Sequence, residues 1–310
     1  MKGSPITPEQ QRILQDFGLG SADILGEGSE SLVFALGSEH VLRLPKRRRP
    51  DGLSFARLKG FLDGIDGKLP FATPTIEEIG EDEAYTIAPR LPGRPMADFL
   101  RTAGNDARDK ALTNYIAAID AFATIEFPDA PYGQLLATNP VTADDWRSYA
   151  HASLDRFRAA NRIAIARDVG DPYELFDHAA DMIAALPQRP QKALVHGDYF
   201  PGNVLIGPDL SVSAVVDFGV FTVVGDATLD LAVACLTLEL MEECTADDGR
   251  FARRLVIERH GEAIAPALRF YRAYLAFSMA DPANIAPPYP RLYGWSIAML
   301  KLLAAGRLPV

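Results

Sequence analysis

The chain has 310 residues, 48% hydrophobic and 23% charged, a composition typical of a globular protein with one large domain or two lobes. Its formal net charge of −10 argues against nucleic-acid binding, and no hydrophobic run reaches the roughly 18 residues of a membrane span. The N-terminus lacks the hydrophobic core of a signal peptide, so we expect a cytoplasmic protein without nucleic-acid or membrane partners.

Strand-forming residues dominate the first third of the chain. A Thr7–Gln10 capping box predicts a first helix, and a stretch with helical spacing lies at 53–66. Strands are expected at about 22–26, 31–37, 40–45, 74–79 and 84–88. Several prolines and a glycine then crowd together, which predicts a hinge near 88–92.

Beyond the hinge the pattern becomes helical. Helices are expected at about 95–103, 107–126, 142–166 and 172–187, and again from about 228 to the end. A strand-rich island at 192–217 interrupts them. The chain is therefore predicted to have an α+β fold with two lobes, a small β-rich lobe at 1–91 and a larger helical lobe at 92–310.

The strand-rich island carries polar residues beside hydrophobic runs. His196 and Asp198 follow one run, Asn203 precedes the next, and Asp217 follows a third. Phosphoryl transfer needs a carboxylate to orient the attacking hydroxyl, and oxygen ligands for the magnesium ions that bridge the phosphates. Asp198, Asn203 and Asp217 can supply these groups, although Asp and Asn are also common in ordinary turns.

The order H-G-D-x-x-x-x-N followed by D-F-G resembles the aminoglycoside phosphotransferase family, which shares the protein-kinase fold. The resemblance implies Asp198 as catalytic base, and Asn203 and Asp217 as ligands of Mg²⁺. A following G-D-x-x-x-D-L-A motif implies that Asp230 braces the catalytic loop, and we interpret His196 as a structural hydrogen-bonding residue. Protein kinases have arginine where this chain has glycine after the histidine, which favours the small-molecule branch.

The first lobe supplies candidates for binding the phosphates of a nucleotide. Gly26, Gly28 and Ser29 lie in a glycine turn whose amides can approach phosphates, although an ordinary hairpin turn fits equally well. The family's third strand normally carries a lysine, and here Arg43 takes that place and can hold phosphate oxygens bidentately. The L-R-x-P pattern around it and the stretch at 69–74 resemble macrolide kinases.

Two further features of the resemblance concern the hinge and the helix before it. The Pro89 carbonyl and the Leu91 amide are expected to face the base of ATP or GTP. The family pairs its lysine with a glutamate on the following helix, where 53–66 offers Arg57 and Lys59 instead. This departure motivates the alternative of a non-catalytic nucleotide-binding protein, against which the intact catalytic motifs argue.

Two groups of residues are candidates for binding the acceptor. Acidic residues that suit a cationic aminosugar, or only an exposed helix end, are Glu239, Glu242 and Glu243. Aromatic residues that suit a macrolide or another bulky acceptor are Tyr289, Tyr293 and Trp295. We therefore expect transfer of the γ-phosphoryl group to a hydroxyl of an aminoglycoside or macrolide antibiotic. A metabolic kinase for choline, homoserine or a sugar is the alternative, and the oligomeric state is not predicted.

Overall fold

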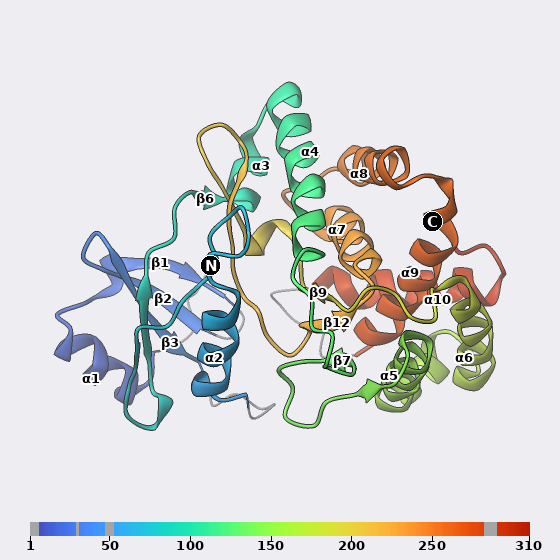
Figure 1. Cartoon of the computed structure of the whole chain (residues 1–310), viewed down its shortest axis with the longest axis horizontal. Coiled ribbons are helices and arrows are strands. Elements are labelled where there is room, and N and C mark those ends of the chain that lie inside the picture. Colours follow the sequence, from blue (N-terminus) through green and yellow to red (C-terminus); the bar gives the residue numbers. More distant parts are fainter. Residues whose placement is uncertain (1–5, 29–30, 47–52, 282–289) are drawn as a thin grey trace.

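The structure is a computed structural model that describes residues 6–28, 31–46, 53–281 and 290–310, and Figure 1 shows its two lobes side by side. The first lobe contains a five-stranded antiparallel sheet in the order β1-β2-β3-β5-β4. Its strands are β1 (Ile24–Glu27), β2 (Ser31–Leu36), β3 (His40–Pro45), β4 (Glu78–Ile79) and β5 (Thr86–Pro89). The predicted small β-rich lobe is confirmed.

One face of this sheet packs on the first helix. Leu32 and Phe34 of β2 and Leu42 and Leu44 of β3 are buried there with Leu14 of that helix. The helix, α1 (Pro8–Asp16), begins with the predicted capping box. Because side chains alternate along a strand, the residues between these leucines lie on the opposite face of the sheet, toward the second lobe.

The helix after β3 connects the two lobes. This helix, α2 (Phe55–Ile65), buries four residues in the large hydrophobic core of the second lobe: Phe55, Leu58, Leu62 and Ile65. Arg57 adds two hydrogen bonds, to the carbonyls of Leu135 and Ala137. Because α2 precedes residue 91 in the chain but packs with the second lobe, the predicted boundary between domains stays a prediction.

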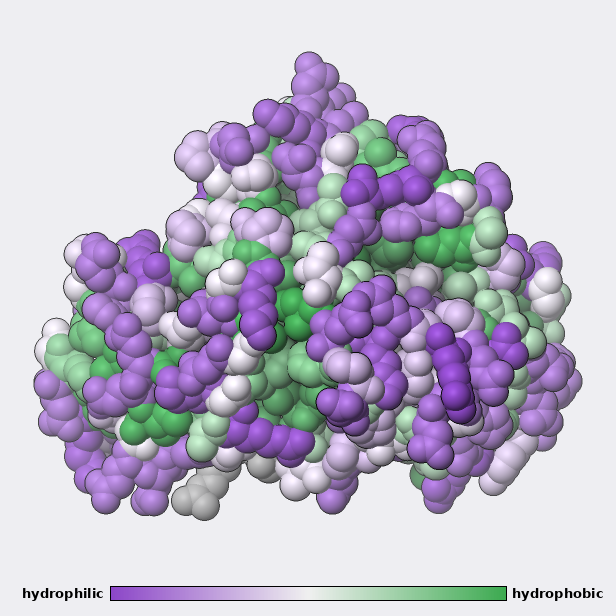
Figure 2. Space-filling model, in the orientation of Figure 1, coloured by the Kyte–Doolittle hydropathy of each residue, from purple (hydrophilic) through white to green (hydrophobic). Residues whose placement is uncertain are grey.

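Helices make up most of the second lobe, as the sequence predicts. They are α3 (Met96–Thr102), α4 (Asn105–Phe122), α5 (Trp146–Asp168), α6 (Pro172–Asp181), α7 (Thr228–Leu240), α8 (Ala246–His260), α9 (Ala265–Met279) and α10 (Pro290–Ala304). Ten of the 13 residues of α7 are buried, so this helix lies at the centre of the core. In the described ranges, no helix is long and apolar enough to cross a membrane. Hydrophilic side chains cover most of the face shown in Figure 2.

Two small sheets carry the strand-rich island. In one, β10 (Val204–Ile206) lies between β11 (Val212–Val215) and β6 (Arg94–Pro95). In the other the order is β8-β7-β12-β9, with β7 (Tyr132–Gln134), β8 (Thr142–Ala143), β9 (Ala193–Val195) and β12 (Val223–Gly225). The sequence did not predict β7, β8 and β12, because strands this short carry almost no alternating pattern.

Two glycines provide a matched test of this packing. A Cβ at Gly225 would lie 2.0 Å from the buried ring of Trp146, whereas a Cβ at Gly60 in α2 would meet nothing within 4 Å. We expect Gly225→Ala to lower the free energy of unfolding by about 1–3 kcal/mol, through overpacking. Gly60→Ala should raise it by about 0.5–1 kcal/mol, because alanine favours a helix. Urea denaturation measures both effects, and equal stability of the two variants would contradict this packing.

Candidate active site

Asp198, Asn203 and Asp217 lie together where the two small sheets meet. The Asn203 side-chain Nδ2 donates to the Asp198 carbonyl at 3.0 Å and to its carboxylate at 3.2 Å. The backbone N–H of Val216 donates to the Asn203 carbonyl at 2.9 Å, which holds the residue before Asp217 against the catalytic loop. The structure therefore brings together the three residues that the sequence singled out.

The donor groups of this unit fit a magnesium ion. Because Nδ2 of Asn203 faces Asp198, its Oδ1 is directed away from that residue and is available as a ligand. The Asp217 carboxylate adds a second hard oxygen donor of the kind that Mg²⁺ prefers. The described part of the chain holds no group of three or more His, Cys, Asp or Glu residues that could bind a metal. Nucleotide phosphates and water would therefore complete the coordination.

A buried carboxylate holds the catalytic loop from within the core. Asp230, in the first turn of α7, accepts from the N–H of His196 at 2.7 Å and from the N–H of Gly197 at 2.8 Å. Burial raises the pKa of Asp230 to about 7, against the opposing effect of these two donors. This is the position that the sequence predicts for the bracing residue.

His196 is fully buried and links two loops of the site. Its Nε2 lies 2.9 Å from the Val216 carbonyl, and its Nδ1 accepts from the N–H of Asp198 at 3.2 Å. One ring nitrogen donates while the other accepts, which is the pattern of a neutral imidazole. Burial also lowers the pKa of His196 to about 4. The ring is therefore suited to orient the loop and unsuited to carry a proton near neutral pH.

The backbone explains why glycine follows His196. Gly197 has a φ of +76°, and a Cβ there would lie 2.0 Å from the carbonyl oxygen of Phe221. Any larger residue would have to displace this contact. Phe221 keeps 56% of its surface exposed although its backbone touches the catalytic loop. Sequence reasoning did not single out Phe221, because a sequence does not show which aromatic rings are exposed in the fold.

Arg43 extends from β3 to the catalytic lobe. It lies between the buried Leu42 and Leu44, so strand alternation turns its side chain toward the second lobe. Its Nη2 lies 3.0 Å from Asp217 Oδ1, and its Nε donates to Ser31 Oγ at 2.7 Å. The sequence indicated neither contact: Asp217 is 174 residues from Arg43 in the chain, and Ser31 is 12 residues away on a strand whose register with β3 the sequence does not specify.

The glycine turn lies beside this arginine. Gly26 is in β1, and the N–H of Gly28 donates to the carbonyl of Ser31 at 2.9 Å, which closes the hairpin between β1 and β2. Ser29 lies outside the described residues. The turn therefore ends at the residue whose hydroxyl contacts Arg43.

The hinge crosses from β5 to the second lobe. Pro89 is the last residue of β5, and Leu91 follows it in a segment without regular structure. Within the described residues, the Leu91 amide makes no backbone hydrogen bond, which leaves it available to a base. Gly93 has a φ of +105°, and a Cβ there would lie 2.2 Å from Ser213 Oγ, so the chain runs close against the second lobe.

The acidic candidates lie at the opposite end of α7 from the catalytic loop. Asp230 contacts that loop from the first turn of α7, whereas Glu242 and Glu243 follow the last turn. A helix of 13 residues is about 20 Å long. Glu243 pairs with Arg101 at 2.6 Å, and Glu242 is exposed. These positions do not support the expectation that the acidic cluster holds an acceptor.

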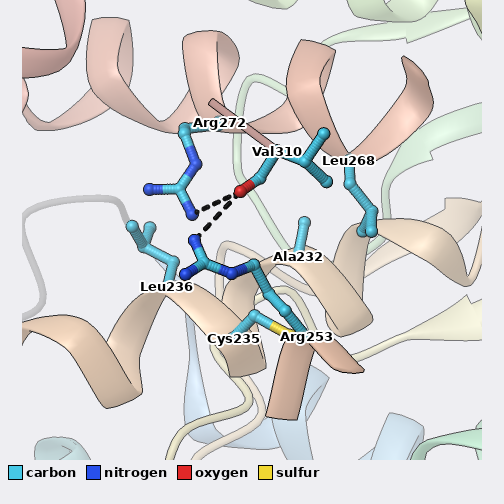
Figure 3. Close-up of a pocket in the computed structure, with 7 residues that line it drawn as sticks. All are labelled: Ala232, Cys235, Leu236, Arg253, Leu268, Arg272 and Val310. Atoms are coloured by element: carbon cyan, nitrogen blue, oxygen red, sulfur yellow. Dashed lines mark hydrogen bonds between the residues drawn. The ribbon is translucent and has the colours of Figure 1, made fainter. Parts of the chain in front are cut away.

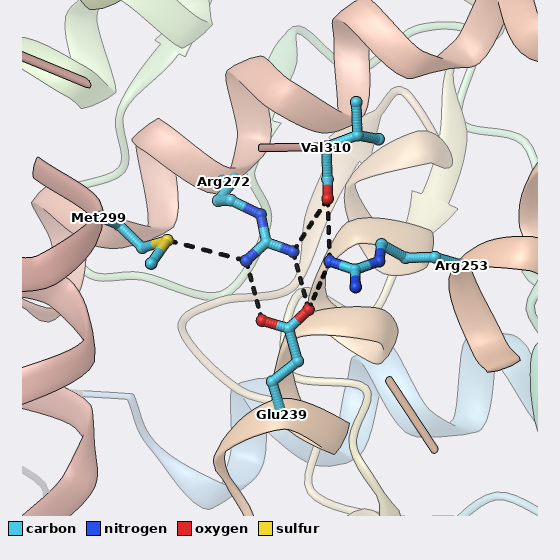
Figure 4. Close-up of polar contacts among 5 residues, drawn as sticks. All are labelled: Glu239, Arg253, Arg272, Met299 and Val310. Atoms are coloured by element: carbon cyan, nitrogen blue, oxygen red, sulfur yellow. Dashed lines mark hydrogen bonds and ion pairs between the residues drawn. The ribbon is translucent and has the colours of Figure 1, made fainter. Parts of the chain in front are cut away.

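Glu239 belongs to an ion-pair cluster (Figure 4). Its two carboxylate oxygens accept from Arg272 at 2.9 Å each, and Arg253 donates to one of them at 2.8 Å. Both arginines also donate to the carbonyl of Val310. The adjoining cavity (Figure 3) has a volume of about 10 Å³, roughly the room that one water needs. The structure therefore places Glu239 in the internal support of the second lobe and not at an acceptor site.

The aromatic candidates have different surroundings. Tyr293 is buried, and its hydroxyl bonds with Arg167 and Asp168 at the end of α5, so it is already engaged. Trp295 packs against the large core, and its indole Nε1 has no hydrogen-bond partner among the described residues. Tyr289 lies outside those residues. Trp295 thus remains the aromatic candidate with an unused donor in the described structure.

Comparison with known proteins identifies the family of this chain. The model of the phosphotransferase enzyme family matches residues 22–292. The chain belongs to this family. A homoserine kinase from Caulobacter sp. (strain K31) is 26% identical over 330 aligned residues, which cover 96% of this chain and 97% of that kinase.

Solved aminoglycoside phosphotransferases share the fold of this family member. A thermostable mutant of APH(4)-Ia, in complex with ADP and hygromycin B, matches with a TM-score of 0.68 and 20% identity, covering 98% of this chain and 100% of that one. ADP-bound APH(2'')-Ib matches with a TM-score of 0.66 and 14% identity, covering 97% and 99%. The kinase-like fold is confirmed, and this protein is a small-molecule phosphotransferase with a hydroxyl acceptor.

The pKa of Asp230 predicts a pH effect on stability. Between pH 3.8 and about 7 the folded protein keeps a proton on Asp230 that the unfolded chain releases. The contribution of Asp230 to stability therefore falls as pH rises through this window. The difference in unfolding free energy between wild type and Asp230→Asn should decline by up to about 1.4 kcal/mol per pH unit. Urea denaturation from pH 4.5 to 7.5 measures this difference. The titration of His196 contributes equally to both proteins, so its effect cancels in the difference. A constant difference would contradict the raised pKa.

Proposed function

We propose that this protein transfers the γ-phosphoryl group of ATP, with Mg²⁺, to a hydroxyl of a small amine-bearing molecule. One observation supports this most strongly: Asn203 is hydrogen-bonded to Asp198 and to the backbone N–H of Val216, and the adjoining Asp217 contacts Arg43 at the junction of the two lobes. Groups suited to a hydroxyl, a metal ion and a phosphate thus converge on one place. Hinge contacts through the backbone suit GTP as well as ATP.

In this proposal Asp198 is the general base. Its carboxylate takes the proton of the acceptor hydroxyl while the new O–P bond forms and the bond between the β- and γ-phosphates breaks. The products are a phosphate ester and ADP. His196 and Asp230 keep the loop in place through its backbone. Asn203 and Asp217 are the proposed ligands of Mg²⁺, which neutralises phosphate charge when it is bound.

The proposed nucleotide contacts come from the small lobe and the hinge: Gly26, Gly28 and Ser29 in the glycine turn, Arg43 on β3, and Pro89 and Leu91. Backbone amides of the turn are suited to phosphate oxygens because glycine lets the backbone approach closely. A guanidinium adds charge and directed donors to the same phosphates. The hinge contributes one carbonyl acceptor and one N–H donor to the base.

Two acceptor classes have support. The likeness to aminoglycoside phosphotransferases over the whole chain favours an aminoglycoside antibiotic, and hence a role in antibiotic resistance. The end-to-end alignment with a homoserine kinase favours an amino-acid alcohol as the alternative. Both acceptors carry a hydroxyl and an ammonium group, and a chain of net charge −10 attracts cations.

Substitutions of the two aspartates should have different effects. Asp198→Asn should lower kcat by about 10²–10⁴-fold, because proton acceptance is lost, while the Kd for ADP with Mg²⁺ stays within about twofold. Asp217→Ala should weaken the binding of magnesium nucleotide itself. Steady-state kinetics and calorimetry measure these quantities. Wild-type turnover by Asp198→Asn would remove Asp198 from the proposed role.

A ligand screen should identify the acceptor class. With ADP and Mg²⁺ present, an acceptor that binds the folded protein raises Tm by mass action. We expect a rise with kanamycin or hygromycin B if the acceptor is an aminoglycoside, and with L-homoserine if it is an amino-acid alcohol. Erythromycin and choline complete the panel. A compound that raises Tm should also accelerate ADP release from ATP. No rise and no acceleration with any member would contradict an amine-bearing acceptor.

A further inference from the structure

The guanidinium of Arg43 bridges the two lobes between a hydroxyl and a carboxylate. Its Nε donates to Ser31 Oγ at 2.7 Å, and its Nη2 lies 3.0 Å from Asp217 Oδ1. Ser31 is 6% exposed, whereas the side chains of Arg43 and Asp217 are 27% and 36% exposed. A buried hydroxyl therefore holds the inner part of the arginine while its outer nitrogens face the open side of the site.

The sheet explains why Ser31 can make this contact. Val33 is the cross-strand partner of Arg43, and Ser31 precedes Val33 by two residues on β2, so it lies on the same face. Ser31 and Arg43 are thus diagonal neighbours across two strands. The Ser31 carbonyl also accepts from the N–H of Gly28. One residue therefore connects the glycine turn with the arginine.

The chemistry of arginine makes this contact directional. The donors of a guanidinium lie in one plane in a fixed fork, so a hydrogen bond at Nε sets the direction of both terminal nitrogens. Here that direction leads to Asp217. Within the described residues, Nη1 of Arg43 makes no hydrogen bond, which leaves it available to a ligand.

We infer that Ser31 is a positioning residue that aims Arg43 at the phosphates of the nucleotide. The inference rests on the proposed function, in which Arg43 binds those phosphates. The family's glutamate partner is absent from α2, the helix that follows β3. Arg57 stands there instead, and its guanidinium donates to carbonyls of the second lobe. The neutral hydroxyl of Ser31 orients the guanidinium of Arg43 without placing a further negative charge beside it. Ser31 therefore sets the affinity for magnesium nucleotide through Arg43.

A double-mutant cycle on Ser31 and Arg43 tests this inference. Calorimetry gives the Kd for ADP with Mg²⁺ in Ser31→Ala, Arg43→Lys and the double variant. Ser31→Ala should raise this Kd about five- to tenfold, because the guanidinium loses its anchor. In the Arg43→Lys background the same substitution should raise it less than about twofold, because lysine has no fixed fork to aim. Ser31→Thr keeps the hydroxyl and should stay within about twofold of wild type.

Ser54→Ala is the matched control for stability. Ser54 Oγ accepts from the N–H of Arg57 at the start of α2, so this variant also loses one serine hydrogen bond but leaves Arg43 untouched. Its Kd for ADP should equal that of wild type even where its Tm falls. A Ser31→Ala Kd within twofold of wild type, or equal effects of Ser31→Ala in both backgrounds, would overturn the inference. A wild-type protein that does not bind ADP with Mg²⁺ would overturn the proposed function together with it.

Discussion

The two hydrogen bonds that Asp230 accepts from the catalytic loop are the constraint on which the site depends. A carboxylate buried in a helical core is costly unless its oxygens find donors. Asp230 finds them in the N–H groups of His196 and Gly197, which fixes the backbone just before Asp198. The left-handed conformation of Gly197 and the neutral His196 follow from the same arrangement. Helix α7 thus positions the carboxylate proposed as the general base, although the two are separate in the chain.

Buried side chains of α2 hold the two lobes together. The ion pair between Arg43 and Asp217, which also joins the lobes, can exchange one anionic partner for another. Four side chains of α2 are buried in the core of the second lobe, and this burial outweighs any single ion pair at the surface. The ion pair of Arg43 and Asp217 is partly exposed, and such pairs contribute only about 0–1 kcal/mol. Arg43 can therefore exchange Asp217 for a phosphate at little cost while its Nε stays bonded to Ser31.

The sequence predicts the parts of the site that local motifs encode. Asp198, Asn203 and Asp217 each adjoin a hydrophobic strand, and the motifs they form carry the family resemblance that implied the fold and their convergence. Contacts across a pair of strands leave no such pattern, because neither segment specifies the register, so the contact of Ser31 with Arg43 was not predicted. A charge pattern in the sequence likewise does not show which charged residues become partners in the fold. Glu239 looked like part of an acidic surface, but its partners come from two other helices that the sequence cannot place beside it.

The departures from the family pattern in the small lobe compensate for each other. Arginine in place of lysine needs an orienting acceptor, and the helix that would offer a glutamate presents Arg57 to the second lobe instead. The hydroxyl of Ser31 fills that need from the neighbouring strand. A protein that had lost catalysis would not be expected to keep a directed cation opposite an intact set of metal-binding groups. Arg43 and Ser31, in place of the family's lysine and glutamate, are therefore better explained as another way to hold phosphate than as decay of the site.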